Sequence, residues 1–352
     1  MKLYPNITIY FIVWFLCLIF IAYFGFLTLP HSESFDNNFF ESFSNWDGGH
    51  FLGIAQYGYT EKFQYAFFPL YPILINFLAK FTNNYLSSAL LISIISAYLG
   101  LHFLYKIISR SFDKKIAGRG VLALLFFPTS FYFLTAYSEG LFFLLAVLTF
   151  YFLQSKSFFW AAVFASFAAA TRLSGLALVL TLAVAIYTLD VKNKYLYILL
   201  SFLGFFGYCF FLYKQVGDPF YFTVAELHWQ RSFSIPGLSF WDSLKSLTGQ
   251  GLLNIHPNVL LDFLFAVFGL GLAMRSVRFL PPMYFTYAIL SVGIPLFTPS
   301  LSSMPRFLLP ILPIFILIAL LKNKYIVLIY QIISLLLLSL FVVLFTGGYW
   351  VS

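Results

Sequence analysis

Residues 46–52, with the sequence WDGGHFL, place a carboxylate three residues before an imidazole. A short helix from His50 to Tyr57 fits this segment, with Asp47 near its start, where a carboxylate suits the helix dipole. A carboxylate so placed is suited to take a proton from an attacking hydroxyl. A second interpretation stays open, in which Asp47 only caps the helix and Trp46 only anchors the chain at a membrane interface.

Two arginines lie beside apolar runs, where an unpaired charge would be costly, and a third lies in a polar segment. Arg172 stands between two such runs, Arg306 stands at the end of another, and Arg231 follows Trp229 in a polar segment. Because a guanidinium group binds phosphate oxygens in a bidentate manner, the set suits a phosphate-bearing substrate. For Arg172 and Arg306 the alternative is a clamp on a lipid headgroup that only anchors the protein.

The composition requires a membrane around these residues. Hydrophobic residues make up 61% of the 352 residues and charged residues only 9%, whereas soluble domains carry about 25% charged residues. The apolar runs are long and continuous, as in 337–344, and lack the alternation of a transmembrane strand. The expected fold class is therefore an all-α integral membrane protein, a polytopic helical bundle.

The apolar runs predict about eleven transmembrane helices in a single membrane domain, 1–352. Two outer loops separate them, loop one over 30–84 and loop two over 215–258, and 66–81 is short and contains prolines, which predicts a re-entrant or interfacial helix. The expected helices cover 8–29, 83–105, 118–136, 139–154, 157–170, 173–189, 195–214, 259–274, 279–298, 307–321 and 325–347. Pro128 should break the third of these.

Charge orients this topology. With the N-terminus in the cytoplasm, most Lys and Arg residues fall in short cytoplasmic loops, as the positive-inside rule requires. The same orientation puts the charged candidates together at the outer face: Asp47, Glu139, Arg172, Arg231 and Arg306. The short loops favour a prokaryotic cell membrane over the endoplasmic reticulum.

The net charge of +8 is spread over loops without a nucleic-acid-binding motif, so no nucleic-acid partner is expected. Cys17 and Cys209 lie in apolar runs and are expected to be packing residues. The outer loops contain no Asp-x-Asp pair, so we expect no cofactor and no metal site, with a divalent ion kept as the open alternative.

The chain resembles the GPI mannosyltransferase II (PIG-V) family, and in particular its shorter prokaryotic relatives, within the GT-C glycosyltransferases. Motifs that carry the resemblance occur in order along the chain: Trp46-Asp47 with His50-Phe51-Leu52, Ala66 to Pro69, Tyr137-Ser138-Glu139, Thr171-Arg172 with Gly175, and Trp229 with Arg231. The compact loops depart from the eukaryotic members and leave the acceptor open.

The resemblance implies a GT-C bundle with two structured extracytoplasmic loops. It also implies an inverting transfer of a hexose, with mannose expected, from a polyprenyl or dolichyl phosphate, and Asp47 as general base. We add the hypothesis that His50 orients the base. The residues expected to bind substrate are Trp46, Tyr137, Glu139, Arg172, Trp229, Arg231 and Arg306. Expected partners are the lipid-linked donor, membrane lipids and an acceptor that is a glycolipid, a glycan or a protein.

Three other functions stay open. A GT-C enzyme for another lipid-linked sugar would share every motif. A transporter or flippase would explain intramembrane arginines, but it predicts an inverted repeat that the sequence lacks. A non-catalytic scaffold would have no need of both Asp47 and His50.

Overall fold

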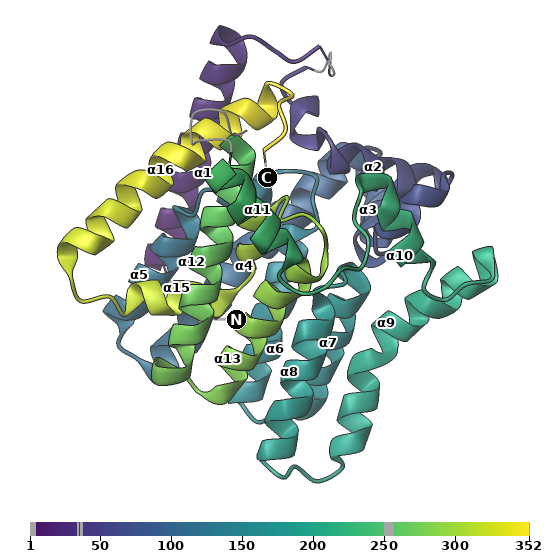
Figure 1. Cartoon of the computed structure of the whole chain (residues 1–352), viewed down its shortest axis with the longest axis vertical. Coiled ribbons are helices and arrows are strands. Elements are labelled where there is room, and N and C mark those ends of the chain that lie inside the picture. Colours follow the sequence, from purple (N-terminus) through teal and green to yellow (C-terminus); the bar gives the residue numbers. More distant parts are fainter. Residues whose placement is uncertain (1–4, 34, 36–37, 250–256, 352) are drawn as a thin grey trace. The chain divides into compact units, whose positions relative to one another are not determined.

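The computed structural model describes residues 5–33, 35, 38–249 and 257–351, and every regular element in them is a helix (Figure 1). This confirms the all-helical prediction. The chain forms two compact units. Unit 1 comprises Met1–Gly58, Leu70–Tyr151 and Ile318–Val351, and unit 2 comprises Tyr59–Pro69 and Phe152–Leu317. Lys2 and residues 250–256 of the predicted second loop lie outside the described residues.

Five helices among the described residues are long and apolar enough to cross a membrane. They are α1 (Pro5–Thr28), α4 (Tyr85–Ser111), α9 (Lys194–Val216), α12 (Pro257–Phe279) and α16 (Lys324–Thr346). Shorter apolar helices are α3 (Leu70–Thr82), α6 (Glu139–Gln154), α7 (Phe158–Thr171), α8 (Gly175–Thr188) and α13 (Pro282–Gly293). The protein is therefore a multi-pass membrane protein, while the number of eleven crossings stays a prediction.

Two of the expected helices are interrupted by proline-containing segments. α5 (Lys114–Leu125) ends before Pro128 and the 3₁₀ helix η3 (Ser130–Leu134) follows, as the proline predicts. The expected helix 307–321 is wrong as a single element. It is divided into α14 (Met304–Leu308) and α15 (Leu312–Ala319), because Pro310 offers no backbone N–H to continue the helix.

The predicted outer loops contain short helices. Loop one holds η1 (Glu41–Ser44), α2 (Asp47–Tyr57), η2 (Lys62–Ala66) and α3. Loop two holds α10 (Tyr221–Ala225), η4 (Glu226–Trp229) and α11 (Leu238–Gly249), and η6 (Ile294–Phe297) follows α13. Among the candidate residues, Trp46, Asp47 and His50 lie in loop one, and Trp229 and Arg231 lie in loop two.

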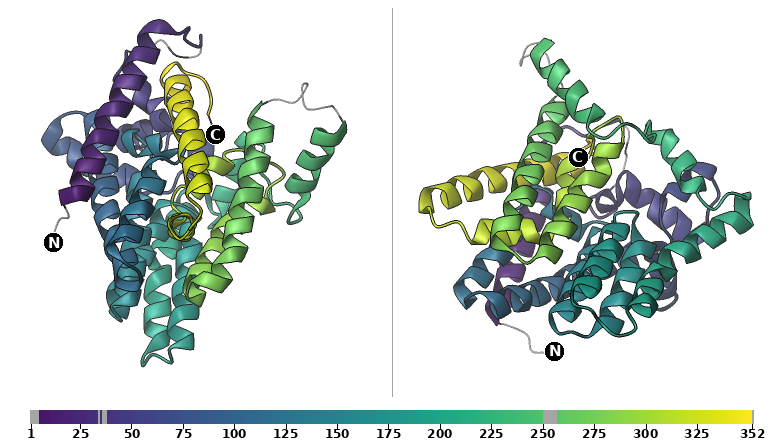
Figure 2. Two further views of the ribbon diagram at one scale, coloured as in Figure 1. Left: turned by 90° about the vertical axis from the view of Figure 1, so that its left-hand side faces the viewer. Right: turned by 60° about the horizontal axis from the view of Figure 1, so that its bottom comes forward.

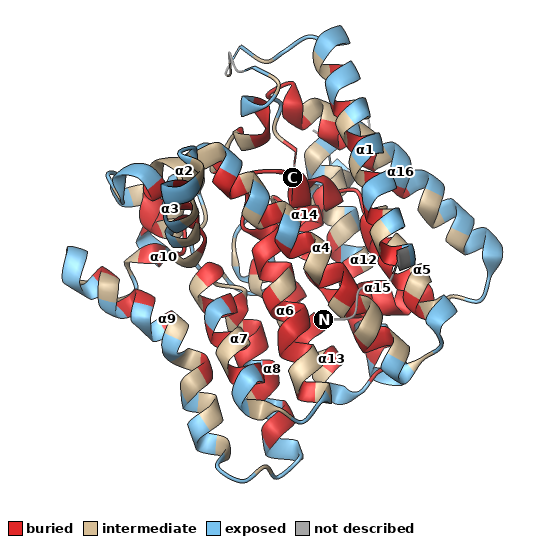
Figure 3. Cartoon of the chain, turned by 180° about the vertical axis from the view of Figure 1, so that it is seen from behind, coloured by how far each residue is buried: buried red, intermediate tan, exposed pale blue. Residues whose placement is uncertain are grey.

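In unit 1, α1 and α16 pack together while their outer faces remain apolar and exposed. A Cβ on Gly25 would come within 2.6 Å of the Val343 side chain, so the two helices touch closely. Phe20 is 71% exposed and Leu336 is 67% exposed, and Figure 3 shows both helices pale blue on their outer sides. Apolar rows of this length suit lipid, because monomeric soluble proteins rarely expose such patches.

Unit 2 is built on the packing of α7, α8 and α9, the teal helices of Figure 2. The closest approach is at Gly204 of α9, whose backbone N–H donates to Ser166 Oγ of α7 at 2.8 Å. A Cβ at Gly204 would lie 1.9 Å from the Ser166 carbonyl oxygen. Small residues bring membrane helices together in this way, because association depends on close van der Waals contact and interhelical hydrogen bonds.

Gly204→Ala should therefore destabilise the protein, because the new methyl group forces α7 and α9 apart. Overpacking of this kind costs about 1–3 kcal/mol, and we expect a fall of several degrees in the unfolding temperature in detergent. Gly207→Ala is the matched control on the same helix, since nothing lies within 4 Å of a Cβ there. Equal unfolding temperatures for the two variants would show that the close approach is not required.

Candidate active site

The Asp47 loop runs directly into α2. Trp46 occupies the N-cap position with φ 60° and ψ −124°, and Asp47 is the first helical residue. The interpretation of Asp47 as the helix cap is therefore not what the structure shows. Asp47 and His50 lie one turn apart on α2, and both are half-buried. Residues at this spacing share one helix face. The helix predicted from His50 to Tyr57 thus begins earlier, at Asp47, and the roles of Asp47 and His50 stay predictions.

The start of α2 rests against the turn that precedes α6. A Cβ on Gly48 would lie 3.3 Å from the Tyr137 ring and 3.5 Å from the Ala136 carbonyl oxygen, so only glycine leaves room there without a shift. The Ala136 N–H donates to the Phe43 carbonyl at 2.9 Å, and the Tyr137 hydroxyl donates to the Asn45 carbonyl at 2.9 Å. Two segments distant in sequence thus fix the backbone just before Asp47.

Tyr137 and Glu139 are fully buried in unit 1. Tyr137 donates its hydroxyl proton to the Asn45 carbonyl, so the structure gives it a positioning role, and direct contact with substrate stays a prediction. Glu139 is the first residue of α6, the end of a helix at which acidic side chains are favoured. The neighbouring Gly140 lies so close to α4 that a Cβ would meet the Ser93 carbonyl oxygen at 2.5 Å. Glu139 is thereby held inside the helix packing.

A third support of the loop comes from residues 345–351 and was not predicted from the sequence. The buried Asn45 side chain donates from Nδ2 to the Phe345 carbonyl at 3.0 Å. The rings of Trp46 and Trp350 are 5.3 Å apart and meet edge to face. The only sequence signal was a tryptophan just after an apolar run, which is also the mark of an interface anchor.

In unit 2, Arg172 and Arg231 meet at one aromatic ring. The Cζ atom of Arg172 lies 5.8 Å from the Phe307 ring centroid, and that of Arg231 lies 5.2 Å from it. Arg231 also donates from Nη2 to the Ser302 carbonyl at 3.0 Å. Both side chains are half-buried. Guanidinium groups are attracted to an aromatic face, so Phe307 holds both arginine side chains.

Arg306 lies on α14, beside Phe307, and is only 6% exposed. The same helix begins at Met304, whose backbone N–H donates to Asp262 Oδ1 at 3.0 Å. Asp262 is buried in the apolar helix α12. It was not predicted as a site residue, although a lone carboxylate in an apolar membrane helix is a functional signal. All three predicted arginines therefore lie in unit 2. Arg172 and Arg231 lie at the Phe307 ring, and Arg306 precedes Phe307 in the chain.

Trp229 lies in an aromatic cluster between η4 and η2. Its ring is 5.7 Å from that of Phe63 and 5.5 Å from that of Phe67, and His228 stacks on Phe63 at 4.3 Å. Nearby, the Tyr59 hydroxyl donates to the Phe67 carbonyl at 2.7 Å. Burial raises the pKa of the Tyr59 phenol well above its usual value, so it stays a neutral donor.

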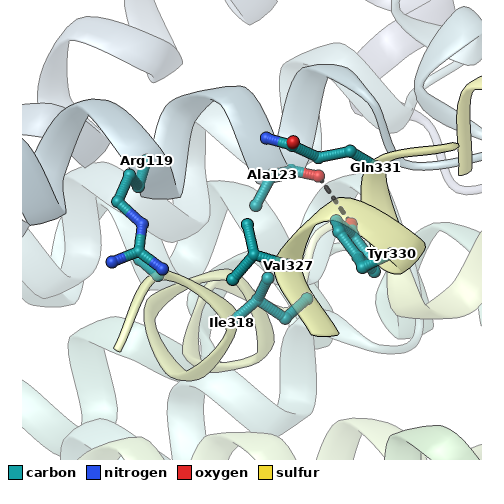
Figure 4. A pocket seen from close by; sticks show the side chains of 7 residues that line it. Arg119, Ala123, Ile318, Val327, Tyr330 and Gln331 are labelled. Atoms are coloured by element: carbon teal, nitrogen blue, oxygen red, sulfur yellow. Dashed lines mark hydrogen bonds between the residues drawn. The ribbon is translucent and has the colours of Figure 1, made fainter. Parts of the chain in front are cut away.

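A small pocket in unit 1 is not a substrate site. It lies between α5, α15 and α16, has a volume of about 20 Å³, and is lined by Arg119, Tyr330 and Gln331 among others (Figure 4). That volume holds about one water molecule, and none of the candidate residues lines it. No cluster of three or more His, Cys, Asp or Glu side chains suited to a metal occurs in the part of the chain that the structure describes.

Comparison with known proteins agrees with the motifs. Residues 27–214, just over half of the chain, match the family described as Mannosyltransferase (PIG-V). Over 109 residues the chain is 34% identical to GPI mannosyltransferase 2 of Drosophila pseudoobscura pseudoobscura, a stretch that covers 28% of this chain and 24% of that relative. The family match over residues 27–214 contains the Asp47 loop, the Glu139 turn and Arg172. The chain belongs to the PIG-V mannosyltransferase family, and with it to the glycosyltransferases, as its motifs predicted.

Proposed function

We propose that the protein transfers mannose from a polyprenyl or dolichyl phosphate to an acceptor hydroxyl, with inversion at the anomeric carbon. The observation that carries this proposal is the pair of guanidinium groups at Phe307, because two positive charges at one ring suit a phosphate leaving group. The start of α2 adds a half-buried carboxylate with an imidazole one turn away. We infer from the family, which is described as mannosyltransferases, that the transferred sugar is mannose.

The proposed reaction is a single displacement. Asp47 takes the proton of the acceptor hydroxyl, and the oxygen forms a bond to the anomeric carbon while the bond from that carbon to the phosphate oxygen breaks. The phosphate leaves with the electron pair as the polyprenyl phosphate. One displacement inverts the anomeric configuration. In this scheme His50 orients Asp47, and Trp46 and Glu139 bind the sugar.

The arginines take the place of a general acid. A phosphate leaves with growing negative charge, and positive groups fixed in advance stabilise that charge in the transition state. We assign Arg172 and Arg231 to binding the phosphate, and the buried Arg306 to stabilising the negative charge of that phosphate. Trp229 is assigned to the sugar or its lipid carrier.

The charge bias of the loops supports transfer on the extracytoplasmic side of a cell membrane, with the N-terminus in the cytoplasm. The lipid-facing rows on α1 and α16 support a donor that arrives from the bilayer. The acceptor is assigned only as a hydroxyl of a glycolipid, a glycan or a protein.

Asp47→Asn should abolish transfer of radiolabelled mannose from polyprenyl-phosphate mannose to membrane lipid extract, while donor binding persists. The amide keeps the shape but cannot accept the proton, and general-base catalysis contributes about 10²- to 10⁴-fold. Asp242→Asn on α11 is the matched control, since Asp242 is exposed. Transfer by Asp47→Asn at the wild-type rate would sink the assignment of the base and leave the enzyme class standing.

Arg172→Gln and Arg231→Gln should each lower kcat/KM for the donor by about tenfold to a hundredfold, the value of one charge-assisted hydrogen bond. Arg275→Gln is the matched control, because Arg275 also stacks on a phenylalanine, with its Cζ 4.9 Å from the Phe279 ring. The measurement is kcat/KM for each variant, from steady-state kinetics in which the donor concentration is varied. A loss in Arg275→Gln equal to that in the others would show that stacking, not phosphate binding, explains the effect.

Transfer should persist in excess EDTA, because the arginines provide the positive charge that a divalent ion would otherwise supply. The measurement is the initial rate with and without chelator, and we expect the two rates to agree within about twofold. Loss of activity that Mg²⁺ or Mn²⁺ restores would contradict this expectation.

A further inference from the structure

Trp46 has two costly features directly before the proposed base. Its φ of 60° is uncommon for a bulky residue, and such strain persists only where the surroundings impose it. Its indole Nε1 atom is buried, and none of the described residues accepts a hydrogen bond from it. A buried donor without an acceptor is destabilising, because it has lost its hydrogen bonds to water. Together the two features indicate a donor held ready for a bound group.

The ring of Trp46 is held between two aromatic neighbours in unit 1. Phe35 meets it edge to face at 5.1 Å, and Trp350 meets it edge to face at 5.3 Å. Trp350 is itself half-buried. It lies outside the family match, which ends at residue 214, so the shared family motifs give it no role.

The position of Trp350 is fixed from both sides along the chain. Tyr132 donates from its hydroxyl to the carbonyl of Val351 at 2.7 Å, in a buried bond. On the other side, Ser32 donates its backbone N–H to the Gly347 carbonyl at 2.8 Å. Gly348 turns the chain at φ 82°, a conformation that favours glycine. The segment 347–351 is therefore docked onto the loop that carries Trp46.

We propose that Trp46 and Trp350 form a sugar-binding subsite beside Asp47, in which Trp350 holds the Trp46 indole so that its N–H donates to a sugar oxygen. A pyranose offers both parts of this recognition, since its hydroxyl and ring oxygens accept hydrogen bonds and its C–H face packs on an aromatic ring. Trp350 acts as a positioning residue and Trp46 contacts the sugar. The inference rests on the proposed function for the identity of the ligand, a sugar.

The first test is steady-state kinetics of the full chain with polyprenyl-phosphate mannose. Trp46→Phe keeps a ring but removes the N–H, and it should raise the donor KM about tenfold, the value of one hydrogen bond. Trp350→Ala should raise KM by a similar factor. Trp350→Phe should restore KM to near the wild-type value, because it supplies an aromatic edge again. Trp160→Ala is the control, since Trp160 lies on α7 and is 50% exposed.

Unfolding temperatures separate positioning from general stability. A merely structural role for Trp350 predicts a lower unfolding temperature and fewer active molecules, with KM unchanged in those that remain. That result for Trp350→Ala would overturn the proposal, as would a KM for Trp46→Phe within twofold of wild type.

A binding measurement keeps this inference distinct from the proposed transfer. Tryptophan fluorescence is recorded while polyprenyl-phosphate mannose, or polyprenyl phosphate without sugar, is added. The subsite predicts a response that requires the sugar and is lost in Trp46→Phe and weakened in Trp350→Ala. That response without any transfer would support the subsite and refute the transfer. Transfer by the wild type without such a response would refute the subsite alone.

Discussion

A chain that faces lipid can leave helical geometry only where its backbone groups find other partners, because the hydrocarbon offers none. This constraint governs where irregular segments occur in the protein. Before Asp47 the chain leaves helix at Asn45 and Trp46, and the Asn45 carbonyl is satisfied by the Tyr137 hydroxyl. At the start of α14 the Met304 N–H is satisfied by the Asp262 carboxylate. The same side chains that satisfy the backbone also fix the candidate residues next to it.

Aromatic rings do much of this positioning. Phe307 attracts two guanidinium groups, and Trp46 contacts both Phe35 and Trp350 edge to face. Large rings suit the task in a membrane protein, because they provide contact area and specific edge or face geometry without requiring a charge. The high aromatic content of the chain, 22%, is thus partly a feature of its sites and not only of its lipid-facing surface.

The two units carry different chemistry. Unit 1 holds Asp47 and His50 on α2, and unit 2 holds Arg172 and Arg231 at the Phe307 ring, with Arg306 next to Phe307 in the chain. In the proposed transfer one partner loses a proton and the other leaves with negative charge, and the residue types of the two units suit these two demands. Two buried polar residues hold backbone next to these groups: Tyr137 donates to the Asn45 carbonyl, and Asp262 accepts from the Met304 N–H.

The sequence by itself determined the helical class, the membrane setting, a short helix from His50 to Tyr57 just after Asp47, and the break at Pro128. These follow from composition, helix periodicity and proline chemistry, which are local. Only the tertiary structure decided that Phe307 gathers the arginines, that Tyr137 supports a loop, and that Trp350 packs on Trp46. Those pairs join residues far apart in the chain, and side-chain packing between distant helices leaves no periodic signal in a single sequence.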